Sequence, residues 1–160
     1  MISNLSGNTV FTVLDMSNGF WQMELDDESS LYTTFQTPFG RYRFKRLCFG
    51  LSSSPEMFME KVIEIFGDIE GCFPYFDDLI IAASSIEQHD AIIQQVFERA
   101  RQFNIRFNEE KIQYQQSEVR FLGVILNSEG IHIDPNRITA IQNFQKPTNK
   151  KAVHRFLRMV

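Results

Sequence analysis

Residues 73–82 of the chain have the sequence FPYFDDLIIA, in which Asp77 and Asp78 stand side by side between two apolar runs. Apolar runs rich in aromatic and β-branched residues are typical of short strands, and the polar pair between them is typical of a hairpin turn. Adjacent carboxylates repel, so one of them is driven toward its protonated form unless a cation shares the site. A hard divalent cation such as Mg²⁺ prefers carboxylate, phosphate and water oxygens, which suits phosphoryl transfer. Asp26 and Asp27 lack this apolar setting and are expected in a solvated loop.

The length and composition describe one folded domain. The chain has 160 residues, enough for a substantial core, and 43% of them are hydrophobic, which excludes a disordered chain. No apolar run is long enough to span a membrane, and residues 1–9 contain no basic segment leading into an apolar core, so no secretory signal is expected. Cys48 and Cys72 lack the spacing of a metal site, so a reducing intracellular setting is expected.

The charge balance alone does not favour a nucleic-acid partner, but the distribution of charge does. The formal net charge is −4, whereas nucleic-acid-binding domains are typically basic. One basic cluster, residues 41–46, is interleaved with aromatic rings, and a second begins after Pro135, where no Asp or Glu follows. Such clusters are most often solvated faces. Two of them on either side of a carboxylate pair favour contact with phosphate backbones.

A further acidic residue stands at the end of an earlier strand. Residues 10–14 predict a buried strand that ends at Asp15. An acidic residue in this position can hold a metal ion over a sheet, although considered alone it more often opens a turn by bonding its own backbone. If this strand neighbours the 73–82 hairpin, Asp15, Asp77 and Asp78 meet at one edge, which is the arrangement that two-metal phosphoryl transfer requires.

The remaining patterns predict an alternation of hairpins and helices. The expected elements are a short strand over 20–25, a hairpin of 31–35 and 42–47, a helix starting at Ser52–Pro55, a helix from Ser85, a strand over 119–126 turned into 131–133, a helix after Asp134, and a last helix over 149–160. His89 is expected to be a partly exposed helix residue. Antiparallel hairpins mixed with helices predict an α+β domain with helices packed on one face of the sheet.

Several motifs stand in an order that resembles a known family. They are Leu14-Asp15 with Gly19-Phe20, residues 34–40, Phe49-Gly50-Leu51 with Ser54-Pro55 and Phe58, Tyr75-Phe76-Asp77-Asp78, and Phe121-Leu122-Gly123. Together they resemble the palm and part of the fingers of a reverse transcriptase, specifically that of a gypsy-type long-terminal-repeat retrotransposon Pol polyprotein. The resemblance covers nearly the whole chain. It implies that residues 1–160 form a fragment of a right-hand polymerase, without the N-terminal fingers, the thumb and the RNase H region.

The resemblance implies a role for each matching position. Asp15, Asp77 and Asp78 would be the catalytic carboxylates that bind two Mg²⁺ ions, for which Mn²⁺ can substitute. The nucleotide-binding positions would be Asn18, Gly19, Phe20, Phe49 and Gly50, and those for primer and template would be Tyr75, Leu122 and Gly123. Phe20 would exclude a ribose 2′-hydroxyl, although from the residues alone Phe20 and Phe49 are more simply explained as core rings.

The implied activity is RNA-directed DNA synthesis, with a template–primer of RNA or DNA, dNTPs and the remainder of the Pol polyprotein (thumb, RNase H, integrase) as partners. No membrane partner is expected, and the implied location is the cytoplasm, in the virus-like particle of the element. Cys48 stands where the family usually has Pro, and Arg158 where it usually has Gly. These departures leave open a catalytically inactive fragment that binds nucleic acid or protein. A different palm-type enzyme, such as a cyclase, is disfavoured by the Phe-Gly motifs, and the chain by itself is expected to extend primers poorly.

Overall fold

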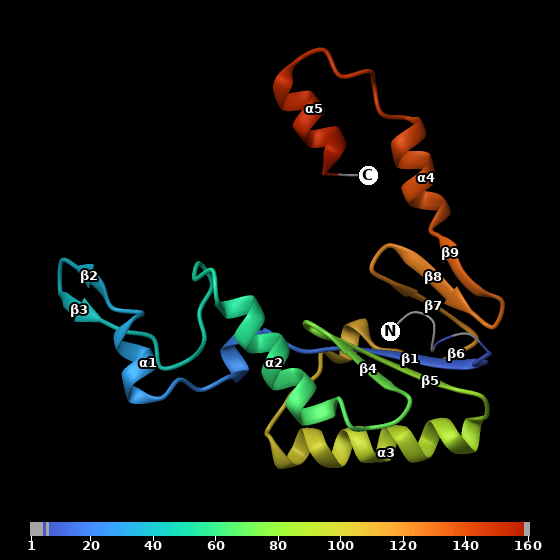
Figure 1. The fold of residues 1–160 in the computed structure, drawn as a ribbon, viewed down its shortest axis with the longest axis horizontal. Coiled ribbons are helices and arrows are strands. Elements are labelled where there is room, and N and C mark those ends of the chain that lie inside the picture. The colour runs from blue at the N-terminus through green and yellow to red at the C-terminus, as the bar shows by residue number, and fades with distance from the viewer. Residues whose placement is uncertain (1–4, 6, 159–160) are drawn as a thin grey trace.

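The centre of the computed structural model, which describes Leu5 and residues 7–158, is a four-stranded antiparallel sheet (Figure 1). Its strands, in the order in which they lie side by side, are β4 (Cys72–Tyr75), β5 (Asp78–Ala83), β1 (Val10–Asp15) and β6 (Gln113–Gln116). The predicted hairpin and the predicted strand before Asp15 are therefore confirmed, and they are neighbours. β6, whose residues are mostly polar and exposed, has no counterpart among the predicted elements.

The two central strands are apolar on both sides because both faces of the sheet are covered. Alternate side chains of a strand point to opposite faces, so β1 and β5 each contribute to two separate cores. Leu14, Leu79 and Ile81 belong to the core under the helices, whereas Phe11 and Ile80 belong to the core on the other face. This double coverage explains why all the residues of β5 after Asp78 are buried.

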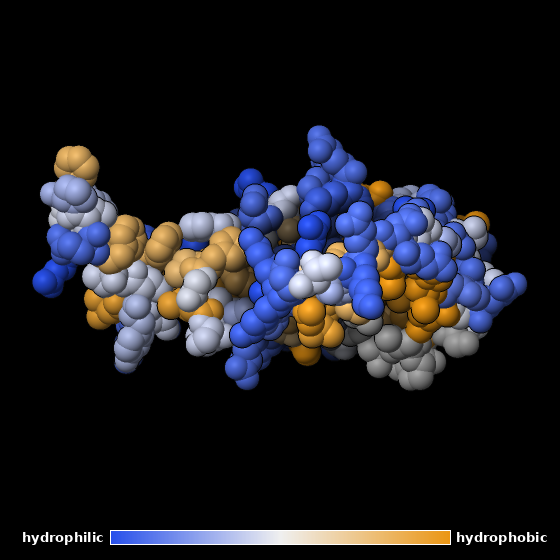
Figure 2. All heavy atoms as spheres, turned by 90° about the horizontal axis from the view of Figure 1, so that it is seen from above, coloured by the Kyte–Doolittle hydropathy of each residue, from blue (hydrophilic) through white to orange (hydrophobic). Residues whose placement is uncertain are grey.

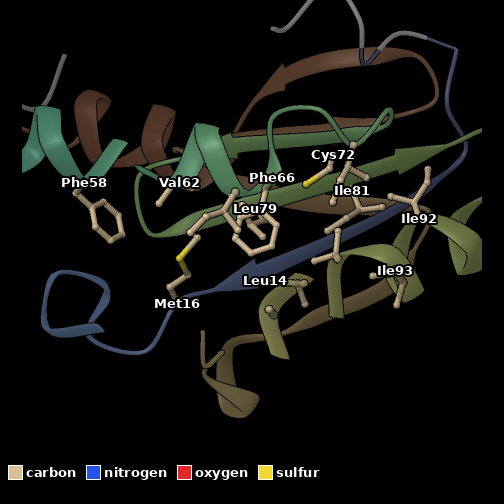
Figure 3. Packing of buried hydrophobic residues seen from close by; sticks show 14 of the residues in the cluster. Leu14, Met16, Phe58, Val62, Phe66, Cys72, Leu79, Ile81, Ile92 and Ile93 are labelled. Atoms are coloured by element: carbon tan, nitrogen blue, oxygen red, sulfur yellow. The ribbon is translucent and has the colours of Figure 1, made fainter. Parts of the chain in front are cut away.

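One face is covered by two amphipathic helices, α2 (Ser54–Phe66) and α3 (Ile86–Gln102). Figure 3 shows side chains from both helices meeting those of β1 and β5 in one cluster. Pro55 lies in the first turn of α2, as predicted, and the Ser54 hydroxyl donates to the Cys48 carbonyl at 2.8 Å. The helix predicted from Ser85 is also confirmed, since the Ser85 hydroxyl accepts a hydrogen bond from the Gln88 N–H at 3.3 Å.

The opposite face is covered by a second sheet, formed by β7 (Glu118–Phe121), β8 (Val124–Asn127) and β9 (Gly130–Ile133). The prediction of one strand over 119–126 was wrong, because Leu122 and Gly123 form a tight turn between β7 and β8. Both turn residues have positive φ, 49° and 76°, as two-residue hairpin turns often require. The turn was not predicted because residues 121–126 are apolar apart from Gly123 and so resemble one continuous strand.

The segment after β1 leaves the central sheet through the 3-10 helix η2 (Gly19–Gln22), which contacts α2, and then forms a small lobe apart from the sheet (Figure 1). This lobe comprises α1 (Asp27–Leu31), β2 (Phe35–Thr37) and β3 (Gly40–Tyr42). The predicted strand over 20–25 is thus wrong, and the predicted hairpin is confirmed only near its turn. The expected solvated loop at Asp26 and Asp27 is the start of a helix, since the Asp26 carboxylate accepts a hydrogen bond from the Ser29 N–H at 2.6 Å.

The C-terminal part contains α4 (Pro135–Gln142) and α5 (Lys150–Leu157), which project away from the central sheet (Figure 1). Asp134 caps α4 by accepting a hydrogen bond from the Asn136 N–H at 2.9 Å, as predicted. The predicted last helix is confirmed as far as Leu157, and Met159 and Val160 lie outside the described residues. Within the described part of the chain, none of the helices combines the length and the apolar composition that a membrane crossing needs.

His89 is fully buried between α3 and the sheet, so the expectation of a partly exposed side chain was wrong. Its Nε2 atom is 2.8 Å from the Thr12 hydroxyl, and its ring packs edge-on against Tyr114. The Thr12 hydroxyl also accepts a hydrogen bond from the Gln115 N–H at 2.8 Å. The Thr12 hydroxyl of β1 therefore gives the buried His89 ring a hydrogen-bond partner. The helical pattern of α3 alone had placed His89 partly in solvent.

We expect Phe66→Ala to lower the free energy of unfolding by about 3–5 kcal/mol, because the ring is fully buried in the helix-side core and its loss leaves a cavity. Ile63 on the same helix is 49% exposed, and Ile63→Ala should cost less than about 1 kcal/mol. Urea denaturation followed by circular dichroism measures both variants. Equal losses would mean that α2 does not bury the face described above.

Candidate active site

The register of β1 and β5 brings three carboxylates to one end of the central sheet. Asp15, the last residue of β1, lies directly opposite Asp78, the first residue of β5. Asp77 precedes it in the two-residue turn that joins β4 to β5, and the Met16 N–H donates a hydrogen bond to the Asp77 carbonyl at 2.6 Å. The sequence-based expectation that these acidic residues are neighbours is therefore confirmed.

The turn that carries Asp77 has an unusual backbone conformation. Phe76 has a φ of 49°, in the left-handed region that a bulky side chain seldom adopts. Its N–H donates to the Met59 sulfur of α2 at 3.1 Å, and its ring lies edge-on to Tyr75, with centroids 5.0 Å apart. A residue keeps such a strained conformation only where surrounding contacts hold it there. Residues of this kind are frequent at functional sites.

Gly19 leaves the space that the Asp77 carboxylate occupies. A Cβ atom at this position would collide with Asp77 Oδ1 and would lie 2.6 Å from Phe58 Cζ. The preceding residue, Asn18, has a φ of 51° and turns the chain from the end of β1 into η2. Gly19 thus lies against the acidic hairpin tip, and any side chain larger than hydrogen at position 19 would displace Asp77.

The three carboxylates affect one another electrostatically. Partial burial raises the pKa of Asp77 above its ordinary value, and the charge of Asp15 raises it further. The pKa of Asp78 is raised by burial, then by the charges of Asp15 and Asp77. Lys111 acts in the opposite direction on both carboxyls. This end of the sheet therefore carries more negative charge than its surroundings compensate, which favours the binding of a cation.

Lys111 is a site residue that the sequence analysis missed. Its Nζ atom lies 3.2 Å from Oδ1 and 3.0 Å from Oδ2 of Asp15, and this ion pair raises the pKa of the lysine. Lys111 ends the short 3-10 helix η3 (Glu109–Lys111), whose acidic neighbours resemble an ordinary solvated segment in the sequence. The contact joins residues 96 positions apart, so no local pattern could reveal it.

The donor set fits Mg²⁺ in kind, since carboxylate oxygens are the protein ligands that hard divalent cations prefer. Within the described residues, no three acidic, histidine or cysteine side chains are gathered in an arrangement that could hold a metal ion as they stand. Both oxygens of Asp15 are engaged by Lys111 instead. A cation that approached Asp15 would therefore meet an ammonium group already in contact with both of its oxygens.

The positions assigned to the nucleotide form a stack of rings beside the carboxylates. Phe20 packs between Phe49 and Phe58, with centroid distances of 4.9 and 5.0 Å. Phe58 is fully buried, whereas Phe49 is 66% exposed, so Phe20 connects the core to the surface. Gly50 follows with a φ of 96°. The packing of Phe20 on Phe58 agrees with a structural contribution, and its role toward a sugar stays a prediction.

The positions assigned to primer and template lie on two adjoining hairpins. Tyr75, at the end of β4, packs edge-on against Phe121 of β7, with ring centroids 6.1 Å apart. Leu122 and Gly123 directly follow Phe121 in the β7–β8 turn, where the Leu122 side chain is 53% exposed. The acidic hairpin and the Leu122–Gly123 turn are thus connected through one aromatic contact. Their roles toward nucleic acid stay predictions.

The fold and the carboxylate arrangement define a polymerase palm, and comparison with known proteins identifies its family. The family described as "Reverse transcriptase (RNA-dependent DNA polymerase)" matches residues 1–126. The chain therefore belongs to the reverse transcriptase family. This match includes Asp15 and the 73–82 hairpin, and it ends within β8.

The similar proteins include Pol polyproteins of transposons. The chain is 32% identical over 160 residues to the retrovirus-related Pol polyprotein from transposon opus of Drosophila melanogaster and 35% identical over 159 residues to that from transposon 412. It is 30% identical over 159 residues to that from transposon gypsy of the same organism. These alignments cover 98–99% of the chain but only 13–16% of each polyprotein. The chain thus resembles a small part of a retrotransposon Pol protein.

The fold is also similar to solved structures. The foamy viral protease–reverse transcriptase in complex with an RNA/DNA hybrid has a TM-score of 0.88 and 25% sequence identity, covering 99% of this chain and 22% of that chain. A second structure of that viral protein, in complex with double-stranded DNA, gives the same TM-score and identity and covers 28% of that chain. These similarities confirm the α+β palm and fingers architecture expected from the sequence.

We expect Asp78→Asn to raise the melting temperature at neutral pH, in the presence of a chelator, by about 2 °C. Because burial and like charges raise the pKa of Asp78 in the folded protein, its ionised form destabilises the fold at any pH above that raised value. The gain should disappear below pH 3.8, where the carboxyl is protonated in both states. Thermal unfolding across this pH range measures the effect.

Asp68→Asn provides a control of opposite sign. A hydrogen bond from Arg99 lowers the pKa of Asp68, so the ionised carboxylate stabilises the fold at neutral pH and loses this contribution as the pH falls through its lowered pKa. Asp68→Asn should therefore lower the melting temperature at neutral pH. A decrease for both variants would contradict the electrostatic description of the carboxylate site.

Proposed function

We propose that the chain is the palm and part of the fingers of an RNA-directed DNA polymerase, which transfers a nucleotide from a dNTP to a primer 3′-hydroxyl. The observation that carries the proposal is the register of β1 and β5, which brings Asp15 opposite Asp78 beside Asp77 in a chain of the reverse transcriptase family. Asp15 and Asp77 would be the principal metal ligands, and Asp78 would lie nearer the primer end.

Two Mg²⁺ ions bound by these carboxylates would supply the charge that activates the primer hydroxyl and stabilises the leaving pyrophosphate. The chain's own contribution is to fix Asp15 and Asp78 at the ends of two strands that are buried on both faces, and Asp77 in the turn beside them. Gly19 keeps the Asp77 carboxylate in position by leaving it room, and the Met16 N–H holds the turn at the Asp77 carbonyl. A site built on such rigid elements needs little rearrangement during the reaction.

The incoming nucleotide would occupy the side of the site that faces the ring stack. Asn18 and Gly19 would offer backbone N–H groups to the triphosphate, and Phe20 would use its ring edge to exclude a 2′-hydroxyl. Its packing between Phe49 and Phe58 supports this proposal, because a ring clamped on both sides cannot turn away from a larger sugar. Phe49 and Gly50 would line the nucleotide and template side.

Primer and template would lie across the palm hairpins and the fingers. Tyr75, Leu122 and Gly123 would support the primer beside the carboxylates. In the fingers, Phe35 packs against both Tyr42 and Phe44, with ring centroids 6.2 and 5.3 Å apart. Figure 2 shows apolar residues interspersed with hydrophilic ones at the end of the molecule that carries β2 and β3.

The basic residues of the fingers strengthen this assignment. Arg41 and Lys45 flank the exposed rings, whereas Arg43 forms an ion pair with Asp27 at 2.9 Å. Exposed rings next to basic side chains are the combination that binds single-stranded nucleic acid, through base stacking and phosphate contacts. The solved foamy viral relative is in complex with an RNA/DNA hybrid, which supports the same class of partner for this chain.

The chain would work as one region of a longer Pol protein. It spans 13–16% of the retrotransposon polyproteins named above, so thumb, RNase H and integrase regions are the expected partners in the same polypeptide. We also propose the cytoplasmic particle of the element as its place of action. A catalytically inactive binding module remains the alternative outcome of the experiment that follows.

Primer extension on an RNA template by the longer Pol protein that contains this chain tests the function. We expect Mg²⁺-dependent DNA synthesis, and we expect Asp77→Asn to reduce it by about 10²–10³-fold, the scale seen when a preorganised electrostatic group is removed. Glu60→Gln, an exposed acidic residue on α2, should leave synthesis unchanged. Undiminished extension by Asp77→Asn would refute the catalytic assignment, and binding of primer–template without extension by the unmodified protein would support the inactive module.

Phe20→Ala in the same protein should admit ribonucleotides. Removing the ring edge opens room for a 2′-hydroxyl, so the preference for dNTP over rNTP, measured as the ratio of the two kcat/KM values, should fall at least tenfold, or about 1.4 kcal/mol. Trp21→Ala, which removes the neighbouring ring in η2, is the control, and its ratio should stay unchanged. Because a general loss of folding lowers both rates equally, an unchanged ratio in Phe20→Ala would reassign Phe20 to a purely structural role.

A further inference from the structure

We propose that Lys111 is a built-in counter-ion of the carboxylate site, which holds Asp15 while no divalent cation is bound and is exchanged for the cation when one binds. The inference rests on the proposed function, because it takes Asp15 as a metal ligand. It adds a competition between an internal ammonium group and the metal for the same two oxygen atoms. The affinity of the site for metal would then be set by this lysine as well as by the carboxylates.

The geometry of the ion pair supports a direct competition. The Lys111 ammonium contacts both oxygens of Asp15, at 3.0 and 3.2 Å. A divalent cation bound to the same oxygens would lie close to this ammonium group, and the two positive charges would repel each other. Binding of the cation at Asp15 therefore favours release of Lys111, and the Lys111 ion pair weakens binding of the cation.

The side chain of Lys111 is free to leave while its backbone stays in place. The Asn108 N–H donates to the Asp15 carbonyl at 2.8 Å, and the Lys111 N–H donates to the Asn108 carbonyl at 3.1 Å. Two residues beyond the end of β1, the Ser17 N–H donates to the Arg106 carbonyl at 3.0 Å. These bonds tie the segment before Lys111 to the end of the strand. The Lys111 side chain itself is 61% exposed, whereas that of Asp15 is only 20% exposed.

The difference in exposure between Lys111 and Asp15 determines what each side chain loses when the ion pair opens. A half-exposed ion pair costs little to open, because water replaces the lost contact of the ammonium group. Asp15 is more enclosed and lies opposite Asp78, so without a cation it would add an uncompensated charge to an already crowded edge. Lys111 thus compensates the charge of Asp15 in the metal-free site, and it lowers the metal affinity below that of the carboxylates alone.

Calorimetric titration of the chain with Mn²⁺ tests the competition. Lys111→Met removes the ammonium group and keeps the length of the side chain, and we expect it to tighten Mn²⁺ binding about two- to fivefold, the range of a half-exposed ion pair. Lys111→Arg keeps the charge and should bind Mn²⁺ close to the affinity of the unmodified chain. Lys61→Met is the matched control, because Lys61 forms an exposed ion pair with Glu64 at 2.7 Å elsewhere and should not alter binding.

A second measurement needs no variant at all. The rate at which a soluble acylating reagent modifies each lysine, read by mass spectrometry, should rise at Lys111 when Mn²⁺ is added, because the reagent attacks the neutral amine, which the ion pair with Asp15 disfavours. The rate at Lys61 should not change. This readout remains valid if Lys111→Met fails to fold.

The outcomes separate the inference from the function on which it rests. If Mn²⁺ binds the unmodified chain and Asp77→Asn abolishes binding, but Lys111→Met has unchanged or weaker affinity and Lys111 acylation does not respond, the counter-ion role is wrong and the metal site stands. If the unmodified chain binds no Mn²⁺, both the metal site and the counter-ion role are overturned. Tighter binding by Lys111→Met with faster acylation supports the exchange.

Discussion

Antiparallel pairing of β1 with β5 is the constraint on which the rest of this protein depends. The pairing runs from Val10 opposite Ala83 to Asp15 opposite Asp78, so the strands place apolar side chains along their length and acidic ones at a shared end. Helices bury one face of this pair and a second sheet buries the other. With both faces dry, the strand end is the nearest place where a carboxylate can reach solvent, and the three acidic groups are concentrated there.

Concentrated negative charge at the end of a buried sheet is costly, and the structure compensates for it locally. Burial and mutual repulsion raise the pKa values of Asp77 and Asp78, while an ammonium group from a distant segment contacts Asp15. The glycine beside the hairpin tip admits the Asp77 carboxylate, and a positive φ at Phe76 turns the chain there. The lysine contact offsets charge at this edge, whereas the glycine and the turn give the Asp77 carboxylate its place there.

Much of this arrangement could be predicted from the sequence because it depends on local patterns. Apolar runs interrupted by acidic residues predicted β1 and the acidic hairpin, and the serine caps predicted the start of α3. The parts that were missed depend on partners far along the chain or on unusual backbone. His89 is buried because Thr12 supplies a hydroxyl, and Lys111 meets Asp15 across 96 positions. The turn at Leu122 needs a positive φ from a residue that usually avoids it.

The alternation of the paired strands also restricts how the gene can change in length. One residue inserted or deleted within β1 or β5 would slide the remaining pairs by about 3.4 Å and turn every following side chain to the opposite face. Asp15 would then leave Asp78, and the two cores would exchange their residues. The exposed tip of the β2–β3 hairpin, near Phe39, carries no such restriction. Insertions and deletions that preserve the protein are therefore confined to loops such as this one, and the spacing inside the two strands is fixed.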